Sequence, residues 1–119
     1  MKTRRWLAAA CMALAAALAH AHAFLERAEP RVGSHVAAAP SEVKLWFREA
    51  LETAFSSVTV TDASGQRVDR DDARVDAAQK GLLRVSLQSL PPGAYTVHWR
   101  AVSIDTHVTQ GQFVFRVGG

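Results

Sequence analysis

The sequence predicts an all-β protein, and the spacing of its apolar residues is the main reason. From about residue 22 onward, apolar residues alternate with polar ones, which is the period of two expected for strands with one buried face. Clusters of Pro, Gly, Asp and Ser interrupt this alternation at short intervals and mark turns. One sheet could not bury so many apolar faces, so we expect a small Greek-key β-sandwich or barrel.

Five alternating runs predict the strands in chain order. Their apolar members are Val43, Leu45 and Phe47; Val58 and Val60; Leu83, Val85 and Leu87; Tyr95, Val97 and Trp99; and Phe113, Phe115 and Val117. A turn at 62–65 follows the second run, and Pro91-Pro92-Gly93 precedes the fourth. Short strands joined in this way are typical of immunoglobulin-like or cupredoxin-like domains.

Two features depart from the simple alternation. The segment 69–80 carries both signs of charge and predicts a solvated connection with a helical turn. Trp46 stands on the polar face of its strand, where either a neighbouring loop covers it or it serves as a docking contact.

The first 21 residues have the layout of an export signal. A positive segment, 1–5, precedes the mostly apolar run 6–18, and small residues follow. That run is too short to span a bilayer. We therefore predict a signal peptide at 1–21 and a mature domain at 22–119, exported to an oxidising compartment, with no membrane insertion after processing.

The cleavage position decides which residue begins the mature chain. Signal peptidase requires small residues near the cut, and two frames provide them. Cleavage after Ala21 exposes His22, and cleavage after Ala19 exposes His20. Both frames place a histidine at the amino terminus.

Charge and sulfur content limit the ligands of the mature chain. Three of the 14 basic residues and none of the 11 acidic ones lie in the signal, which leaves 11 of each and no net charge. A chain without a basic excess is a poor partner for nucleic acid, so we exclude that class. The sulfur-bearing residues Met1, Cys11 and Met12 also lie in the signal, so the mature chain has no soft ligand for Cu(I).

Four histidines remain after the signal, namely His22, His35, His98 and His107. His98 falls on the polar face of its strand and is expected to face solvent, and His35 lies in a predicted loop. His107 differs because Asp105 precedes it by two residues, and in an extended segment both side chains would project to the same side.

An amino-terminal histidine strengthens the case for a metal at this pair. The amine and imidazole of His22 can chelate one ion, to which Asp105 adds an oxygen and His107 a third nitrogen. Such a set suits Cu(II), which stands at the top of the divalent affinity order and favours tetragonal N/O geometry. The residues therefore predict one Cu(II) per chain at His22, Asp105 and His107.

Several strings in the mature chain resemble the CopC-type periplasmic copper-resistance proteins. They are His22-Ala-Phe-Leu25 with Pro30 beyond it, the strings at 43–49, 92–100 and 111–115, and, most specifically, Trp-Arg-x-Val-Ser-x-Asp-x-His at 99–107. The resemblance covers essentially the whole mature chain, and its spacing from His22 to Pro30 favours cleavage after Ala21.

The resemblance implies a β-sandwich or barrel that binds Cu(II) through His22, Asp105 and His107. It also implies that Glu49 is an outer-shell acceptor that orients an imidazole or the amine, with a plain surface carboxylate as the alternative. Some relatives hold a second, cuprous site in a Met-rich loop. The corresponding segment here, 60–80, contains no methionine, so we expect that site to be absent.

The leading functional hypothesis is a copper-homeostasis protein that is not an enzyme. It would buffer or sequester Cu(II), or deliver it to an inner-membrane copper transporter or a periplasmic oxidase. One alternative is a copper oxygenase with an amino-terminal histidine, although Asp105 would fill the position that oxygen needs. The other is a metal-free immunoglobulin-like interaction module, which composition and periodicity fit equally well and which would bind Cu(II) only weakly.

Overall fold

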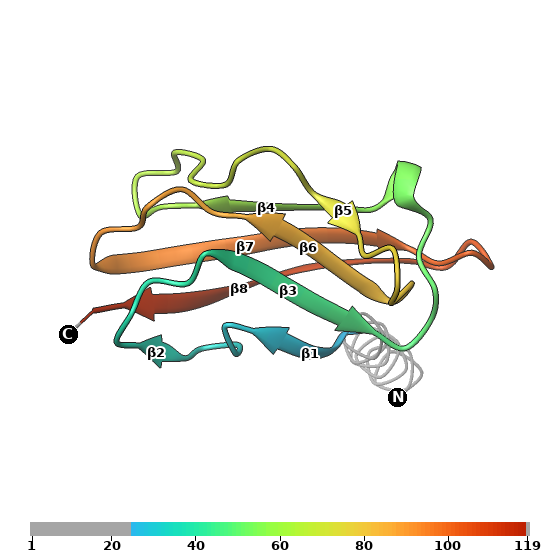
Figure 1. The fold of residues 1–119 in the computed structure, drawn as a ribbon, viewed down its shortest axis with the longest axis horizontal. Helices are drawn as coiled ribbons and strands as arrows, with labels where there is room; N and C mark the ends of the chain where they lie inside the picture. The colour runs from blue at the N-terminus through green and yellow to red at the C-terminus, as the bar shows by residue number, and fades with distance from the viewer. Residues whose placement is uncertain (1–24, 119) are drawn as a thin grey trace, which may run out of the picture.

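The computed structural model describes residues 25–118, which form two stacked four-stranded sheets (Figure 1). One sheet contains, in spatial order, β1 (Leu25–Glu29), β3 (Glu42–Phe47), β6 (Leu82–Ser86) and β5 (Arg74–Val75). The other contains β2 (His35–Val36), β8 (Val108–Val117), β7 (Gly93–Val102) and β4 (Ser57–Thr61). The predicted all-β fold is confirmed, and it is a sandwich of two separate sheets. Between residues 25 and 118, no helix is long and apolar enough to cross a membrane.

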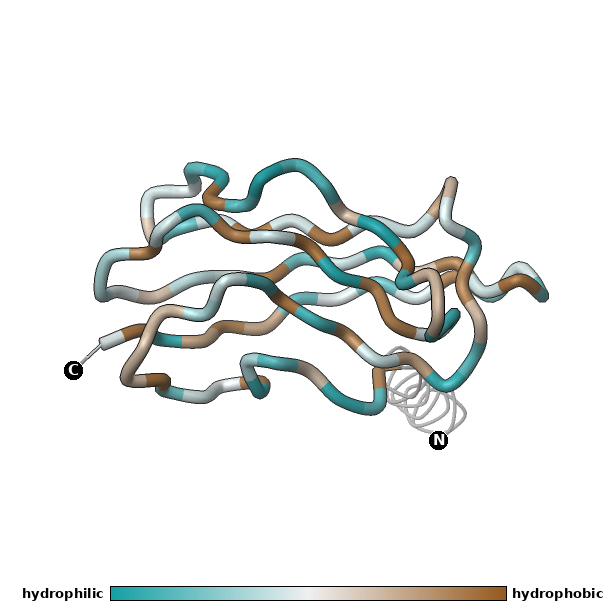
Figure 2. The backbone as a smooth tube through the Cα atoms, in the orientation of Figure 1, coloured by the Kyte–Doolittle hydropathy of each residue, from teal (hydrophilic) through white to brown (hydrophobic). Residues whose placement is uncertain are grey.

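The core lies between the sheets and is built from the predicted alternating runs. Every apolar member of the five runs is buried, with no more than 6% of its surface exposed. Most intervening positions carry polar residues, with Trp46 and Val114 as the exceptions, and hydropathy alternates along β3 and β6 (Figure 2). Because side chains alternate strictly between faces, a slip of one residue would expose a whole run, so the pattern also specifies the register.

The β7–β8 hairpin runs the length of the sandwich, from one end to the other. Its residue pairs extend from Gly93 with Val117 to Val102 with Val108, a distance of about 30 Å along the strands. The turn 103–107 closes the hairpin at one end, and the loop before β7 and the C terminus lie at the other (Figure 1).

Trp99 of this hairpin depends on the glycine opposite it. Trp99 pairs with Gly111, where a Cβ atom would come within 2.6 Å of two indole carbons. The indole also packs against Phe47 of the facing sheet, with ring centroids 6.5 Å apart. A larger residue at 111 would therefore displace a ring that joins the two sheets.

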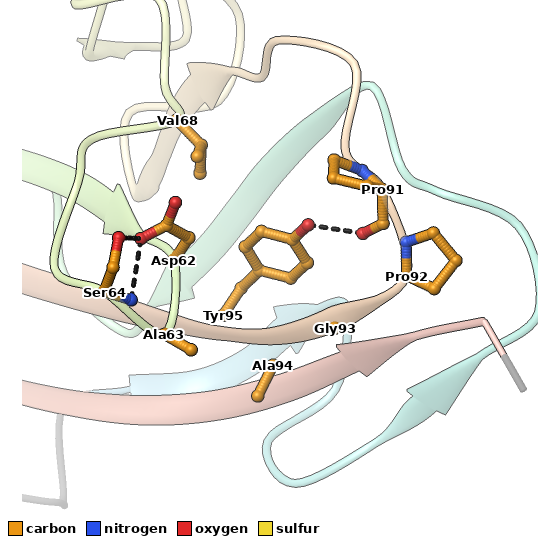
Figure 3. A pocket seen from close by; sticks show the side chains of 9 residues that line it. All are labelled: Asp62, Ala63, Ser64, Val68, Pro91, Pro92, Gly93, Ala94 and Tyr95. Atoms are coloured by element: carbon orange, nitrogen blue, oxygen red, sulfur yellow. Dashed lines mark hydrogen bonds between the residues drawn. The ribbon is translucent and has the colours of Figure 1, made fainter.

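A cavity of about 320 Å³ lies at the end of the sandwich that carries the C terminus (Figure 3). Inside it, the Tyr95 hydroxyl donates to the carbonyl oxygen of Pro91, and Asp62 accepts hydrogen bonds from the N–H and hydroxyl of Ser64 at 2.9 and 2.7 Å. Among the described residues that line the cavity, Asp62 is the one carboxylate and there is no histidine. The cavity therefore offers no mixed nitrogen and oxygen set for a metal.

The Trp46 side chain is covered from two directions. The guanidinium carbon of Arg27 lies 4.0 Å from the centroid of the indole, and the indole N–H donates to Gln79 Oε1 at 3.3 Å. Of the two predicted explanations for this exposed-face tryptophan, cover by neighbouring segments is the one that the structure shows.

The segment 69–80 differs from its prediction, because it contains β5 and no helical turn. It is also less solvated than its charges suggest, since the Asp69 side chain is fully buried. The Asp69 carboxylate accepts hydrogen bonds from the N–H groups of Val60 and Asp71 at 2.8 and 2.9 Å and from Arg67 at 2.6 Å. It thereby accepts a hydrogen bond from a backbone N–H at the outer edge of β4, where no further strand of residues 25–118 pairs. Local propensity does not reveal this tertiary contact.

We expect Asp69→Asn to destabilise the fold by about 2–4 kcal/mol, because an amide cannot accept from all three donors. Burial raises the pKa of Asp69, but hydrogen bonds from Arg67, Val60 and Asp71 outweigh it and leave the pKa below its usual value. A lowered folded pKa stabilises the native state above the unfolded pKa of about 3.9, and this stabilisation is lost as pH falls through the folded pKa.

Urea unfolding at neutral and acidic pH measures both effects. The variant should be less stable than the natural chain at neutral pH and should lose less stability on acidification. The matched control is Asp71→Asn, because the Asp71 side chain contacts the same Arg67 but is 87% exposed. Equal losses from the two variants would show that burial of Asp69 is not the cause.

Candidate metal centre

Backbone pairing between the segment that follows β3 and the β7–β8 turn builds the candidate site. The N–H of Ile104 donates to the Ala50 carbonyl at 3.0 Å, and the N–H of Glu52 donates to the Val102 carbonyl at 2.7 Å. A bridge between residues 51 and 103 lies between these bonds. The chain directly after Glu49 is thus held against the hairpin turn.

Gly81 holds the same part of the chain from the other side. The N–H of Phe47 donates to the Gly81 carbonyl at 2.8 Å. A Cβ atom on residue 81 would lie 2.5 Å from the Phe47 oxygen and 3.2 Å from the Glu49 oxygen. The two backbones approach more closely than any side chain at 81 would permit, so Gly81 sets the path of the chain at Glu49.

The Asp105 and His107 pair lies in a turn and not, as predicted, in an extended segment. The N–H of Ser103 donates to the His107 carbonyl and the N–H of Thr106 to the Ser103 carbonyl, both at 2.9 Å. Thr106 has φ of 72°, in the left-handed region, which reverses the chain between the two side chains. Their predicted proximity is therefore correct, but its cause is a tight turn. Ser103 and Asp105 are the local sequence signal for this turn, because serine and aspartate both favour turns.

Glu49, Asp105 and His107 form one cluster. Each offers a ligand atom, and these atoms all lie within 4.8 Å of one another. Nδ1 of His107 lies 3.1 Å from Oδ2 of Asp105, and the two side chains are 62% and 51% exposed. Glu49 is half-buried. The cluster is open to solvent, and it presents one imidazole and two carboxylates, a set that attracts a divalent cation.

Asp105 is held in its charged form. A hydrogen bond from the Ser103 hydroxyl is the main reason that the pKa of Asp105 lies below its usual value; burial opposes this shift, and hydrogen bonding with Glu49 and the charge of His107 add to it. A lowered pKa means that the carboxylate is ionised over a wider pH range. Asp105 is therefore available to a cation at neutral and mildly acidic pH.

The other two histidines among residues 25–118 lie outside this cluster. His35 is in β2, paired with Arg116 of β8, and not in the predicted loop; its Nε2 contacts the Gly118 carbonyl. That pairing joins distant parts of the chain, so local sequence could not indicate it. His98 lies on the outer face of β7 as predicted, but it is half-buried, and its Nε2 lies 3.4 Å from the Thr61 hydroxyl.

The structure thus brings together three of the four residues assigned to the site from the sequence. Glu49, predicted as an outer-shell acceptor, joins Asp105 and His107 in the same cluster. The fourth, His22, lies outside the described residues, as does the predicted signal peptide at 1–21.

Comparison with known proteins identifies the family. The CopC domain matches residues 25–118. Protein YobA of Escherichia coli (strain K12) is 39% identical over 98 residues, which cover 82% of this chain and 79% of that protein. Copper resistance protein C of Pseudomonas syringae pv. tomato is 36% identical over 110 residues, which cover 87% of this chain and 86% of that protein. The crystal structure of CopC from Methylosinus trichosporium OB3b superposes with a TM-score of 0.74 at 36% identity, over 82% of this chain and 94% of that one. The chain belongs to the CopC domain family.

Proposed function

We propose that the protein binds one Cu(II) ion per chain in the periplasm and serves copper homeostasis. The observation that carries this proposal is the cluster of Glu49, Asp105 and His107 at one end of the sandwich. The name of the related copper resistance protein C supports copper as the metal. Copper is here a cargo that the protein holds and releases.

The amino terminus supplies the remaining ligands in this proposal. Leu25, the first residue of β1, pairs with Phe47 in antiparallel register. A chain continued backward from Leu25 in that register would run beside the residues that follow Phe47, where Glu49 lies. His22 is three residues before Leu25, a span of at most about 10 Å. Register and reach therefore support the His22 amine and imidazole as ligands, with Asp105 and His107 completing the set.

Glu49 orients the ligands in this proposal. Its carboxylate can accept a hydrogen bond from the His22 amine or from an imidazole N–H. Such outer-shell acceptors fix the orientation of a ligand and raise its basicity. The half-buried position of Glu49 and the close backbone contact with Gly81 support this role, because both limit the movement of its chain segment.

The ligand set favours Cu(II) over Cu(I) and binding over catalysis. Beyond residue 12 the chain contains neither cysteine nor methionine, whereas cuprous ions prefer sulfur ligands. Asp105 stands beside His107 and would fill the coordination position that an oxygenase needs to keep open. The exposure of His107 and Asp105 supports exchange of the ion with a partner, for which we propose an inner-membrane copper transporter or a periplasmic oxidase.

Titration of the mature protein should show one tight equivalent of Cu(II) and no retention of Cu(I) against a cuprous chelator. Trp99 lies three residues before the end of β7 that carries the site, so we expect its fluorescence to be quenched at the same equivalence point. Weak binding without a defined equivalence point, or tight retention of Cu(I), would contradict the proposed function.

A further inference from the structure

Ser103 is buried beneath the candidate metal centre and is hydrogen-bonded to both residues of its turn. Ser103 is only 2% exposed. Its hydroxyl donates to Oδ1 of Asp105 and accepts from the N–H of His107 at 3.2 Å. The His107 carbonyl lies 3.4 Å from the same hydroxyl, but a hydroxyl has one hydrogen, and an ionised carboxylate is a stronger acceptor than a carbonyl oxygen. The hydrogen therefore goes to Asp105.

We propose that Ser103 is a positioning residue that sets the orientation of Asp105 and His107 for metal binding. This inference rests on the proposed Cu(II) site. The Asp105 side chain is 51% exposed, so without an anchor it would sample several rotamers, and ordering it on binding would reduce affinity. The buried hydroxyl of Ser103 provides that anchor before the ion arrives.

The same hydrogen bond also limits how Asp105 can bind. Because Ser103 holds Oδ1 from the interior, the other oxygen, Oδ2, is the one directed to His107 Nδ1, at 3.1 Å. Asp105 thus presents a single oxygen beside the imidazole. One oxygen per carboxylate suits the tetragonal geometry of Cu(II), whereas a carboxylate free to bind through both oxygens would distort it.

The chain provides a matched control in Ser56. Ser56 is also buried, at 9% exposed, and its hydroxyl accepts from the N–H of Val102 at 3.1 Å, one residue before Ser103. It therefore stabilises the same end of β7, but its hydrogen bonds are with Val102 and not with Asp105 or His107. Loss of either hydroxyl should weaken the fold, and only loss of the Ser103 hydroxyl should change the metal site.

The experiment compares Ser103→Ala, Ser103→Thr and Ser56→Ala with the natural mature protein. Competitive Cu(II) titration measures affinity, electron paramagnetic resonance of the copper complex reports the ligand geometry, and thermal unfolding reports stability. We expect Ser103→Ala to lose about ten- to a hundredfold in Cu(II) affinity, the range typical of outer-shell partners. Its resonance spectrum should also change, because Asp105 is then free to turn.

Ser56→Ala should lower the unfolding temperature yet keep the natural Cu(II) affinity and resonance spectrum. Ser103→Thr keeps the hydroxyl, so it should also show the natural affinity and spectrum. If the extra methyl prevents Ser103→Thr from folding, the comparison of the two alanine variants still tests the positioning role of Ser103. Natural affinity and spectrum in Ser103→Ala, or equal losses in both alanine variants, would overturn the positioning role. Failure of the natural protein itself to bind Cu(II) would instead overturn the proposed function.

Discussion

A glycine- and serine-rich extension of more than three residues ahead of His22 should lower the Cu(II) affinity of the mature protein by orders of magnitude and leave its fold intact. The extension converts the terminal amine into an amide nitrogen, which is neutral and a far poorer donor, and so removes one ligand of the proposed chelate. The fold should persist because the added residues can extend into solvent ahead of β1 without removing a core contact. Competitive Cu(II) titration of the natural and extended forms measures the change.

The design of this experiment depends on where the mature chain begins. The extension must be longer than about three residues, because a histidine at the third position forms a copper chelate with the terminal amine without help from the fold. Cleavage after Ala19 would create that arrangement, with His20 first and His22 third. Intact-mass measurement of periplasmic material identifies the first residue of the mature chain, which we predict to be His22. Equal affinities of the two forms would mean that the amino-terminal chelate is not the site.

His107→Ala should also reduce Cu(II) affinity by orders of magnitude, because it removes a nitrogen ligand from the proposed set. The side chain is 62% exposed, so the free energy of unfolding should change by no more than about 0.5 kcal/mol. The measurement is the same competitive titration, paired with urea unfolding.

His35→Ala is the matched control for this variant. His35 is also an exposed histidine, but it lies in β2, next to the C-terminal end of β8, and outside the cluster. Its replacement should leave Cu(II) affinity unchanged. A large loss of affinity in His35→Ala, or natural affinity in His107→Ala, would contradict the assignment of the site to the β7–β8 turn.

Alternation of apolar and polar residues predicted five of the eight strands of the described residues. The five predicted runs correspond to β3, β4, β6, β7 and β8, and their apolar residues form the core. Three strands escaped prediction: β2 and β5 have two residues each, a length that contains no period, and β1 lacks a regular alternation because its register shifts between Leu25 and Arg27. The two short strands depend on partners distant in the chain, β8 and β6, and not on their own composition.

The segment 69–80 illustrates the opposite case, in which composition misleads. Its charges indicate a solvated connection, and most of its residues are indeed exposed. Asp69 is nevertheless buried, because its carboxylate takes the place of a strand partner for β4 and is paired with Arg67. No local pattern distinguishes this aspartate from its exposed neighbours.

The sequence by itself determined the all-β class, the buried face of each long strand and the residue types that can bind a metal. These follow from short-range periodicity and from side-chain chemistry, both of which are properties of the chain before it folds. The tertiary structure decided where Glu49 lies relative to the turn, since backbone bonds between 50–52 and 102–104 join segments half the chain apart. It also decided that Asp105 and His107 meet through a left-handed residue at Thr106 and a buried hydroxyl at Ser103. The approach of Glu49 to the turn exists only once the two sheets have packed, because β3 and β7, which bring the two segments into reach, lie in different sheets.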